Sequence, residues 1–273
     1  MSVVNSNIKA LVASQALKAS EKNLGTAMER LSTGKRINSA ADDAAGLAIG
    51  NKMATQIRSL NQSVRNANDA ISMIQTADGA AGGITNLLIR MRELAVQATN
   101  GTNSTSDKTA LQTEFASLQT EITRISDKTT WNGVALIGAD AGSVAYQIGI
   151  DGSADSQVTV TFKDLNSGTS FATAVASSTS ATSTTSITHI DDAISALDAF
   201  RSDLGAKINR LNFAADNLTN IATNTAASRS RIVDTDYAQT TSELARAQIV
   251  RQAGTAMLAQ ANQQPAFVLA LLR

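Results

Sequence analysis

The opening of the chain carries an apolar position every seven residues. The members of this repeat are Val3, Ala10, Leu17, Leu24 and Leu31. Such spacing puts them on one stripe of a helix that packs lengthwise against another helix. The run Ser32-Thr33-Gly34 ends the pattern. Residues 1–44 are therefore predicted to form an N-terminal helical segment whose partner lies elsewhere in the chain.

A second seven-residue repeat follows a polar, glycine-containing connection. It pairs Ile57, Val64 and Ile71 with Leu60, Ala67 and Ile74. Farther on, the apolar positions are Ala77, Ile84, Met91 and Ala98, with Leu87 and Leu94. This change of phase predicts a local stammer near Asp78-Gly79. Residues 45–99 are predicted to form one helix of roughly 80 Å at the usual rise per residue.

The loop at 100–107 is rich in turn formers and holds a candidate helix cap. Beyond it, a third repeat comprises Leu111, Phe115, Leu118, Ile122 and Ile125. A short loop between two long helices favours an antiparallel pair, so the third helix should return beside the second.

After Trp131-Asn132-Gly133 the period of the apolar positions changes to two. They are Val144, Tyr146, Ile148 and Ile150, then Val158, Val160 and Phe162. This alternation around a polar turn at 151–156 predicts a β-hairpin. Residues 177–186 are almost all Ser and Thr, which predicts a solvent-facing surface segment.

Helical spacing returns over residues 187–232 and continues through 233–273. In the last segment the candidate packing residues are Leu244, Val250, Met257, Leu258, Leu271 and Leu272. Neither end of the chain has a local partner for its apolar stripe. The two ends are therefore predicted to pair with each other and then with copies of the same chain.

The predicted fold is mainly α: a long antiparallel coiled-coil bundle with a small β-hairpin region and paired N- and C-terminal helices. We expect four segments. Residues 1–44 and 233–273 form an inner core domain, while 45–186 and 187–232 form a central rod with the hairpin and the Ser/Thr-rich segment.

Composition supports this architecture and narrows the functional classes. Of 273 residues, 43% are hydrophobic but only 3% are aromatic, and Pro265 is the only proline, so long uninterrupted helices are permitted. The 23 basic and 23 acidic residues balance, which disfavours nucleic-acid binding. No run approaches the roughly 20 apolar residues of a spanning helix, and no basic-then-apolar leader opens the chain, so neither membrane insertion nor a cleaved secretory peptide is expected.

Catalytic chemistry finds little support in the residue types. There is no cysteine, and the single histidine, His189, stands alone at a predicted helix start. The pairs Asp42-Asp43 and Asp191-Asp192 are adjacent in sequence, so their side chains diverge on a helix. We expect no metal, no cofactor and no enzymatic activity.

Two long motifs resemble the termini of bacterial flagellins. The first is Leu31-Ser32-Thr33-Gly34-Lys35-Arg36-Ile37-Asn38 and its continuation through Ile49. The second runs from Ser242-Glu243-Leu244-Ala245-Arg246-Ala247-Gln248-Ile249 to the final Leu271-Leu272-Arg273. The resemblance covers about 1–140 and 187–273.

This resemblance implies a subunit of the extracellular flagellar filament, exported by the flagellar type III apparatus without a cleaved leader. It implies as partners further copies of the chain, an export chaperone at about 234–273, and the hook–filament junction and cap proteins. Arg90, Leu94 and Glu114 match the patch that the Toll-like flagellin receptor of animals recognises; charge alone would make Arg90 and Glu114 a solvated face. The alternative function is a flagellin-like surface adhesin or glycan-binding protein.

Overall fold

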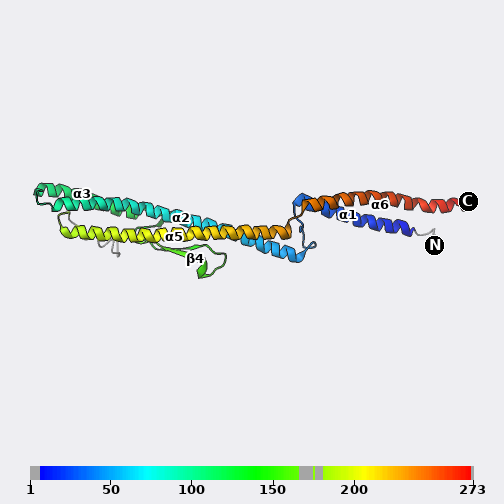
Figure 1. Ribbon diagram of the computed structural model, residues 1–273, viewed down its shortest axis with the longest axis horizontal. Coiled ribbons are helices and arrows are strands. Elements are labelled where there is room, and N and C mark those ends of the chain that lie inside the picture. The colour runs from blue at the N-terminus through cyan, green and yellow to red at the C-terminus, as the bar shows by residue number, and fades with distance from the viewer. Residues whose placement is uncertain (1–6, 166–174, 176–180, 272–273) are drawn as a thin grey trace. The chain divides into compact units, whose positions relative to one another are not determined.

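Long helices dominate the part of the chain that the structure describes. The computed structural model describes residues 7–165, 175 and 181–271. The helices are α1 (Ile8–Thr33), α2 (Ala44–Thr99), α3 (Thr105–Lys128), α5 (Thr184–Val233) and α6 (Tyr237–Leu271), as Figure 1 shows. Short strands follow α3: β1 (Thr130–Trp131), β2 (Val134–Ala135), β3 (Ser143–Gln147) and β4 (Gln157–Thr161). The predicted fold class is confirmed.

Local chemistry sets several of the helix ends. The Asn7 side chain accepts a hydrogen bond from the Ala10 N–H at the start of α1, and Gly34 ends that helix with φ +70°. Ser104 and Asp107 form a capping box at the start of α3. The Asn7 and Ser104 side chains thus bind backbone N–H groups that the first helical turn leaves without partners.

The buried face of α2 keeps one seven-residue repeat without interruption. One set of buried positions is Leu60, Ala67, Ile74, Ala81, Leu88 and Ala95; the other is Ser63, Ala70, Ala77, Ile84, Met91 and Ala98. The predicted stammer near Asp78-Gly79 is therefore wrong. Larger neighbours such as Ile71 and Leu87 lie beside the seam and are only partly buried.

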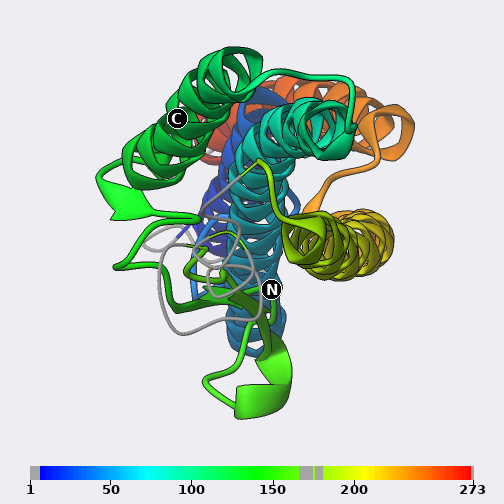
Figure 2. The ribbon, with the colours of Figure 1, turned by 90° about the vertical axis from the view of Figure 1, so that its left-hand side faces the viewer.

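Helix α2 runs antiparallel to α3 and to α5. The Arg90 guanidinium contacts Glu114 of α3 at 2.8 Å. Arg92 pairs with Asp191 of α5 at 2.6 Å, and Arg201 of α5 pairs with Asp78 at 2.7 Å. Figure 2 views these helices end-on and shows α2 beside both neighbours. The predicted antiparallel bundle is confirmed.

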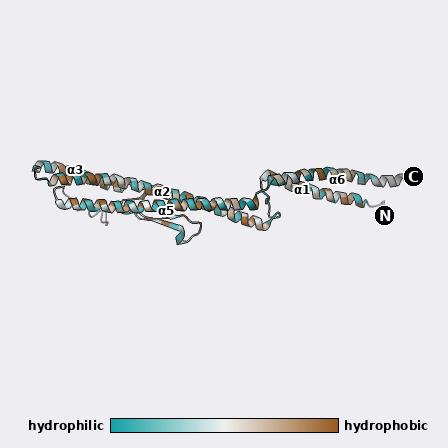
Figure 3. Ribbon diagram, viewed as in Figure 1, coloured by the Kyte–Doolittle hydropathy of each residue, from teal (hydrophilic) through white to brown (hydrophobic). Residues whose placement is uncertain are grey.

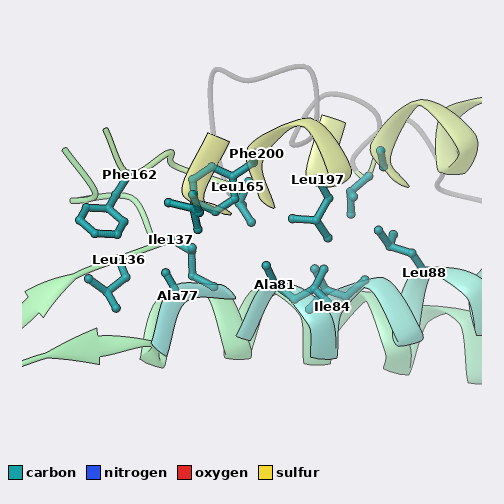
Figure 4. Packing of buried hydrophobic residues seen from close by; sticks show 14 of the residues in the cluster. Ala77, Ala81, Ile84, Leu88, Leu136, Ile137, Phe162, Leu165, Leu197 and Phe200 are labelled. Atoms are coloured by element: carbon teal, nitrogen blue, oxygen red, sulfur yellow. The ribbon is translucent and has the colours of Figure 1, made fainter. Parts of the chain in front are cut away.

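Small and branched side chains fill the space between the helices. Figure 4 shows Ala77, Ala81 and Ile84 of α2 facing Leu197 and Phe200 of α5. At one end of this cluster, Leu136, Ile137, Phe162 and Leu165 come from the segments around the hairpins; all are buried. The small alanine side chains on α2 let the helices approach closely. Close approach keeps the core densely packed although few aromatic rings are available to fill it.

The predicted hairpin is present as the pair β3–β4. The two strands are antiparallel, with Val144 opposite Val160 and Tyr146 opposite Val158. The Asn66 side chain of α2 donates to the Gln147 carbonyl at 2.9 Å, which ties the hairpin to the helix. A second, two-residue hairpin turns at Asn132-Gly133, where both φ angles are positive, as a primed turn requires.

The Ser/Thr-rich segment is not uniformly solvent-facing. Residues 176–180 lie outside the described residues, but Ala181 and Ser186 are buried. The Ala181 N–H donates to the Gln112 side chain at 2.6 Å, and α5 already begins at Thr184. Low complexity misled the prediction, because small side chains fit close to a neighbouring helix as readily as they face water.

The described chain forms two compact units. One comprises residues 1–57 with 223–273, and the other comprises residues 58–222. The first contains the paired termini and the second contains the helical bundle with its hairpins. The four-segment division expected from the sequence stays a prediction.

Candidate functional site

The terminal helices α1 and α6 lie side by side and antiparallel. The Asn7 side-chain amide donates to the Ala261 carbonyl at 2.8 Å, and the Ser20 hydroxyl donates to the Ala247 carbonyl at 3.3 Å. Between these points the backbone at Gly254 lies against the Leu17 side chain. The predicted pairing of the two ends is confirmed.

The predicted packing residues lie on both sides of this pair. Ala10, Leu17, Leu24, Leu31, Leu244 and Leu258 are half-buried, while Val250 and Met257 are exposed. Val3 and Leu272 lie outside the described residues, and Leu271 is described only as the last residue of α6. The structure thus brings the half-buried set into the helix pair and leaves two predicted members facing outward.

The pair also exposes large apolar residues that the predicted packing set does not include. In α1 the fully buried residues are Ser20 and Ala27, whereas Leu11 is 71% exposed and Met257 of α6 is 67% exposed. Other exposed large apolar residues are Ile8, Val12, Met28 and Ile249. Apolar residues recur along both helices in Figure 3. The i, i+3, i+4 spacing of Ile8, Leu11 and Val12 is the sequence signal for this second face.

Described residues of α1 and α6 line two open grooves. The larger, about 620 Å³, is lined mainly by apolar side chains that include Ile8, Val12 and Met257. The other, about 550 Å³, includes Ser20, Arg30 and Glu243. Open apolar grooves between helices accept helical side chains from a partner.

Backbone hydrogen bonds join the segment that follows α1 to the segment between α5 and α6. The Arg36 N–H donates to the Val233 carbonyl at 2.7 Å, and the Thr235 N–H donates to the Gly34 carbonyl at 3.0 Å. Within the first connection, the backbone N–H groups of Ser39 and Asn38 donate to Asp42, and these bonds hold the pKa of that carboxyl below its usual value. The link between α1 and α2 is therefore a defined turn.

The candidate receptor patch is only partly assembled at the surface. Arg90 bridges Glu93 and Glu114, and its hydrogen bonds to Glu114 and then Glu93 raise its pKa. Leu94, in contrast, is fully buried in the bundle core. A shallow hollow beside Arg90 is lined by Ile89, Arg92, Glu93, Val96 and Gln97. The structure thus brings Arg90 and Glu114 together at the surface and places Leu94 in the core.

The described residues offer association surfaces and little chemistry. No group of three or more acidic or histidine side chains in the described ranges could hold a metal ion. His189 is half-buried on α5. None of the helices described has the length and apolar character needed to cross a bilayer. Paired helices with uncovered apolar faces define a structural protein that associates through helix packing.

Comparisons with known proteins place this class in a family. Residues 4–140 match the bacterial flagellin N-terminal helical region, and residues 187–272 match the bacterial flagellin C-terminal helical region. The chain belongs to the bacterial flagellin family. A flagellin of Halalkalibacterium halodurans is 43% identical over 271 residues, which cover 99% of this chain and 100% of that protein.

A more distant relative agrees with this assignment. Flagellin E of Vibrio cholerae is 33% identical over 373 aligned residues, which cover 99% of each chain. The crystal structure of Bacillus cereus flagellin is 32% identical, covers 60% of this chain and 94% of that chain, and has a TM-score of 0.49.

The function of the chain follows from its membership in this family. Flagellins are structural proteins that assemble into the filament of the bacterial flagellum, so this chain is a filament subunit that serves motility. The filament is extracellular. The alternative, a surface adhesin or glycan-binding protein, is not favoured, because both terminal regions of the family are present.

Proposed function

We propose that the α1–α6 pair is the part of the subunit through which copies hold one another in the filament. The observation that carries this proposal is the exposed apolar surface of the pair, including Leu11 and Met257. Exposed patches of this kind are typical of association sites. The half-buried members of the predicted packing set hold the pair together, and the exposed apolar residues contact neighbouring copies.

Electron microscopy of purified subunit, after seeding or salting out, tests this role. The full chain should form filaments, and a chain lacking residues 235–273 should form none. Met257→Glu should raise the critical concentration for assembly, because it places a charge on the apolar face. Gln248→Glu, at an exposed polar position of α6, is the matched control and should assemble normally; equal effects of the two substitutions would refute the proposal.

Export and chaperone binding form a second part of this proposal. We propose that the subunit is secreted unfolded by the flagellar type III apparatus, and that an export chaperone covers residues 234–273 before assembly. The absence of cysteine suits such passage, because no disulfide can lock the chain. Size-exclusion chromatography with purified chaperone should show a complex with the full chain and none after removal of residues 234–273.

Contacts at the two filament ends belong to this proposal as well. The first and last subunits of a filament each lack a neighbour on one side, so apolar surface remains uncovered there. We propose that the hook–filament junction proteins and the cap protein cover it. Seeding by purified junction proteins should shorten the lag of assembly, whereas an unchanged lag would count against this contact.

The Arg90–Glu114 surface is the proposed contact for the animal Toll-like flagellin receptor. Arg90 and Glu114 are half-exposed and already paired, and Leu94 supports α2 from inside the core. Monomer carrying Arg90→Ala and Glu114→Ala should lose potency in a receptor reporter assay. Arg124→Ala removes a comparable exposed Arg–Glu pair elsewhere on α3 and should leave potency unchanged; equal loss from this control would refute the contact.

A further inference from the structure

Methionine is the only source of sulfur in this chain, since the sequence contains six methionines and no cysteine. Met28 of α1 is 57% exposed and Met257 of α6 is 67% exposed. Both lie in the unit that contains the paired termini. Met53 of α2 is half-buried, and Met1 lies outside the described residues. A methionine side chain that peroxides can reach is oxidised at sulfur, so exposure selects Met28 and Met257 as the candidates for modification.

The helical bundle protects the methionines of its own core. Met73 is 4% exposed and Met91 is fully buried. The Tyr146 hydroxyl donates a hydrogen bond to the Met73 sulfur at 2.6 Å, which occupies a lone pair that an oxidant would have to reach. A buried sulfur of this kind reacts only when the surrounding structure opens. The fold therefore separates reactive methionines at the chain ends from protected ones in the bundle.

The reaction is a two-electron transfer of oxygen to the thioether. A lone pair of the methionine sulfur attacks one oxygen of hydrogen peroxide, the O–O bond breaks, and a proton shift releases water. The sulfur is oxidised to a sulfoxide and the peroxide is reduced, so no further reactant is needed. The product is polar and chiral where the thioether was apolar.

The position of Met257 makes its sulfoxide unfavourable for association. Met257 lines the larger groove of the α1–α6 pair together with Ile8, Val12 and Val250. A sulfoxide oxygen is a hydrogen-bond acceptor that water satisfies. Apolar side chains of another copy would remove that water and supply no donor in its place, which costs free energy. Oxidation thus alters the surface proposed for association and leaves the bundle core as it was.

We propose that Met257, together with Met28, is a site of reversible oxidation by hydroperoxides, and that free subunits carrying the sulfoxide are excluded from the filament. The inference rests on the proposed role of the α1–α6 pair in assembly. Subunits already in a filament are protected, because neighbouring copies cover the same side chains. Methionine sulfoxide reductases, one for each sulfoxide epimer, reverse the modification.

Peptide mass mapping after a timed exposure to hydrogen peroxide tests the site. In dilute monomer, Met257 and Met28 should gain an oxygen at least about tenfold faster than Met73 and Met91. In filaments formed beforehand, Met257 should react at least about tenfold more slowly than in monomer. Equal rates for Met257 and Met91 in monomer, or for Met257 in monomer and filament, would overturn the proposal.

Assembly assays on the full chain test the consequence. Oxidised monomer should polymerise with a critical concentration raised by about tenfold or more, and treatment with both reductases should restore the original value. Met257→Gln places a polar group of similar size at this position and should raise the critical concentration without oxidant. Unchanged assembly of monomer in which Met257 is fully converted to the sulfoxide would overturn the proposal.

Leucine variants separate this modification from general damage by peroxide. The double change Met28→Leu with Met257→Leu conserves apolar volume, so it should assemble within about twofold of wild type both before and after peroxide. Met53→Leu keeps both exposed sulfurs and should stay sensitive. Sensitivity of the double variant, or resistance of Met53→Leu, would refute the assignment.

Untreated wild-type chain, run in parallel, distinguishes this inference from the function on which it rests. Its failure to form filaments would refute the proposed role in assembly. The mass map would still decide whether Met257 is the modified residue, because that measurement on monomer does not depend on polymerisation.

Discussion

Tyr146 is the residue whose titration the fold alters most clearly. Its hydroxyl donates to the Met73 sulfur at 2.6 Å, and burial raises its pKa from 10.0 to about 12. The unfolded chain ionises at a lower pH than the folded chain. The contribution of the neutral Tyr146 hydroxyl to stability is therefore fully present below pH 10 and is lost as the pH rises from 10 towards 12. Denaturant unfolding should show this fall in wild type and a smaller fall in Tyr146→Phe; identical pH profiles would contradict it.

Gly34 and Gly25 give opposite predictions within one helix. Gly34 has φ +70°, and a Cβ there would lie 2.9 Å from the Tyr237 hydroxyl, so Gly34→Ala should destabilise the chain by about 1–3 kcal/mol. Gly25 lies inside α1 with nothing within 4 Å of an added Cβ, so Gly25→Ala should stabilise it by about 0.5–1 kcal/mol. Thermal unfolding of filaments built from each variant measures the signs, because α1 is expected to be stably folded only in the assembly, and a shared sign would refute the argument.

Single residues were harder to place from the sequence than the elements that carry them. Met257 and Val250 share the spacing of half-buried Leu258 and Leu244, yet they face outward. Periodicity assigns residues to a face within about one position, and it does not say which of two apolar faces meets the intramolecular partner. Leu94 matches the receptor patch by family resemblance, whereas the structure buries its side chain completely in the bundle core.

At the scale of elements, the capping box at the start of α3 predicts how much its first turn is stabilised. Hydrogen bonds from the Ser104 hydroxyl and then its N–H lower the pKa of Asp107. The ionised Asp107 carboxylate therefore stabilises the fold above pH 3.8, its pKa in the unfolded chain. This contribution is lost as the pH falls through the lower pKa of the folded chain. Amide exchange in the first turn of α3 should rise about fivefold in Ser104→Ala. Ser106→Ala is the control, and equal exchange in both variants would refute the cap.

Helix positions followed from the sequence because the apolar repeats are long and their ends are marked. The ends of α2 and α3 lie close to the predicted ones. The phase of the α2 seam did not follow, since Ala70, Ala81 and Ala95 occupy buried positions while larger Ile71 and Leu87 lie beside them. The prediction assigned the larger apolar side chains to the buried seam. Close packing of the helices instead places the smaller alanine side chains there.

At the scale of the whole molecule, the pairing of the two chain ends was predictable and the function followed from it. Neither end had a local partner, so mutual pairing was the simplest way to cover both apolar stripes. Apolar surface left over for further copies was expected as well, because two helices cannot bury faces on all their sides. That excess distinguishes the terminal pair from the central bundle, whose α2 residues from Ala67 to Ala98 include a continuous buried seam.

Folding of the terminal helices should therefore be coupled to assembly. In α1 the buried residues are Ser20 and Ala27, so a lone α1–α6 pair lacks the burial that offsets the entropy of ordering about 60 residues. Amides of residues 8–31 should exchange fast in dilute monomer and slowly in filaments, while α2 amides from Ala67 to Ala98 remain protected in both states. Strong protection of residues 8–31 in dilute monomer would show that the pair is stable alone, and assembly would then join preformed helices.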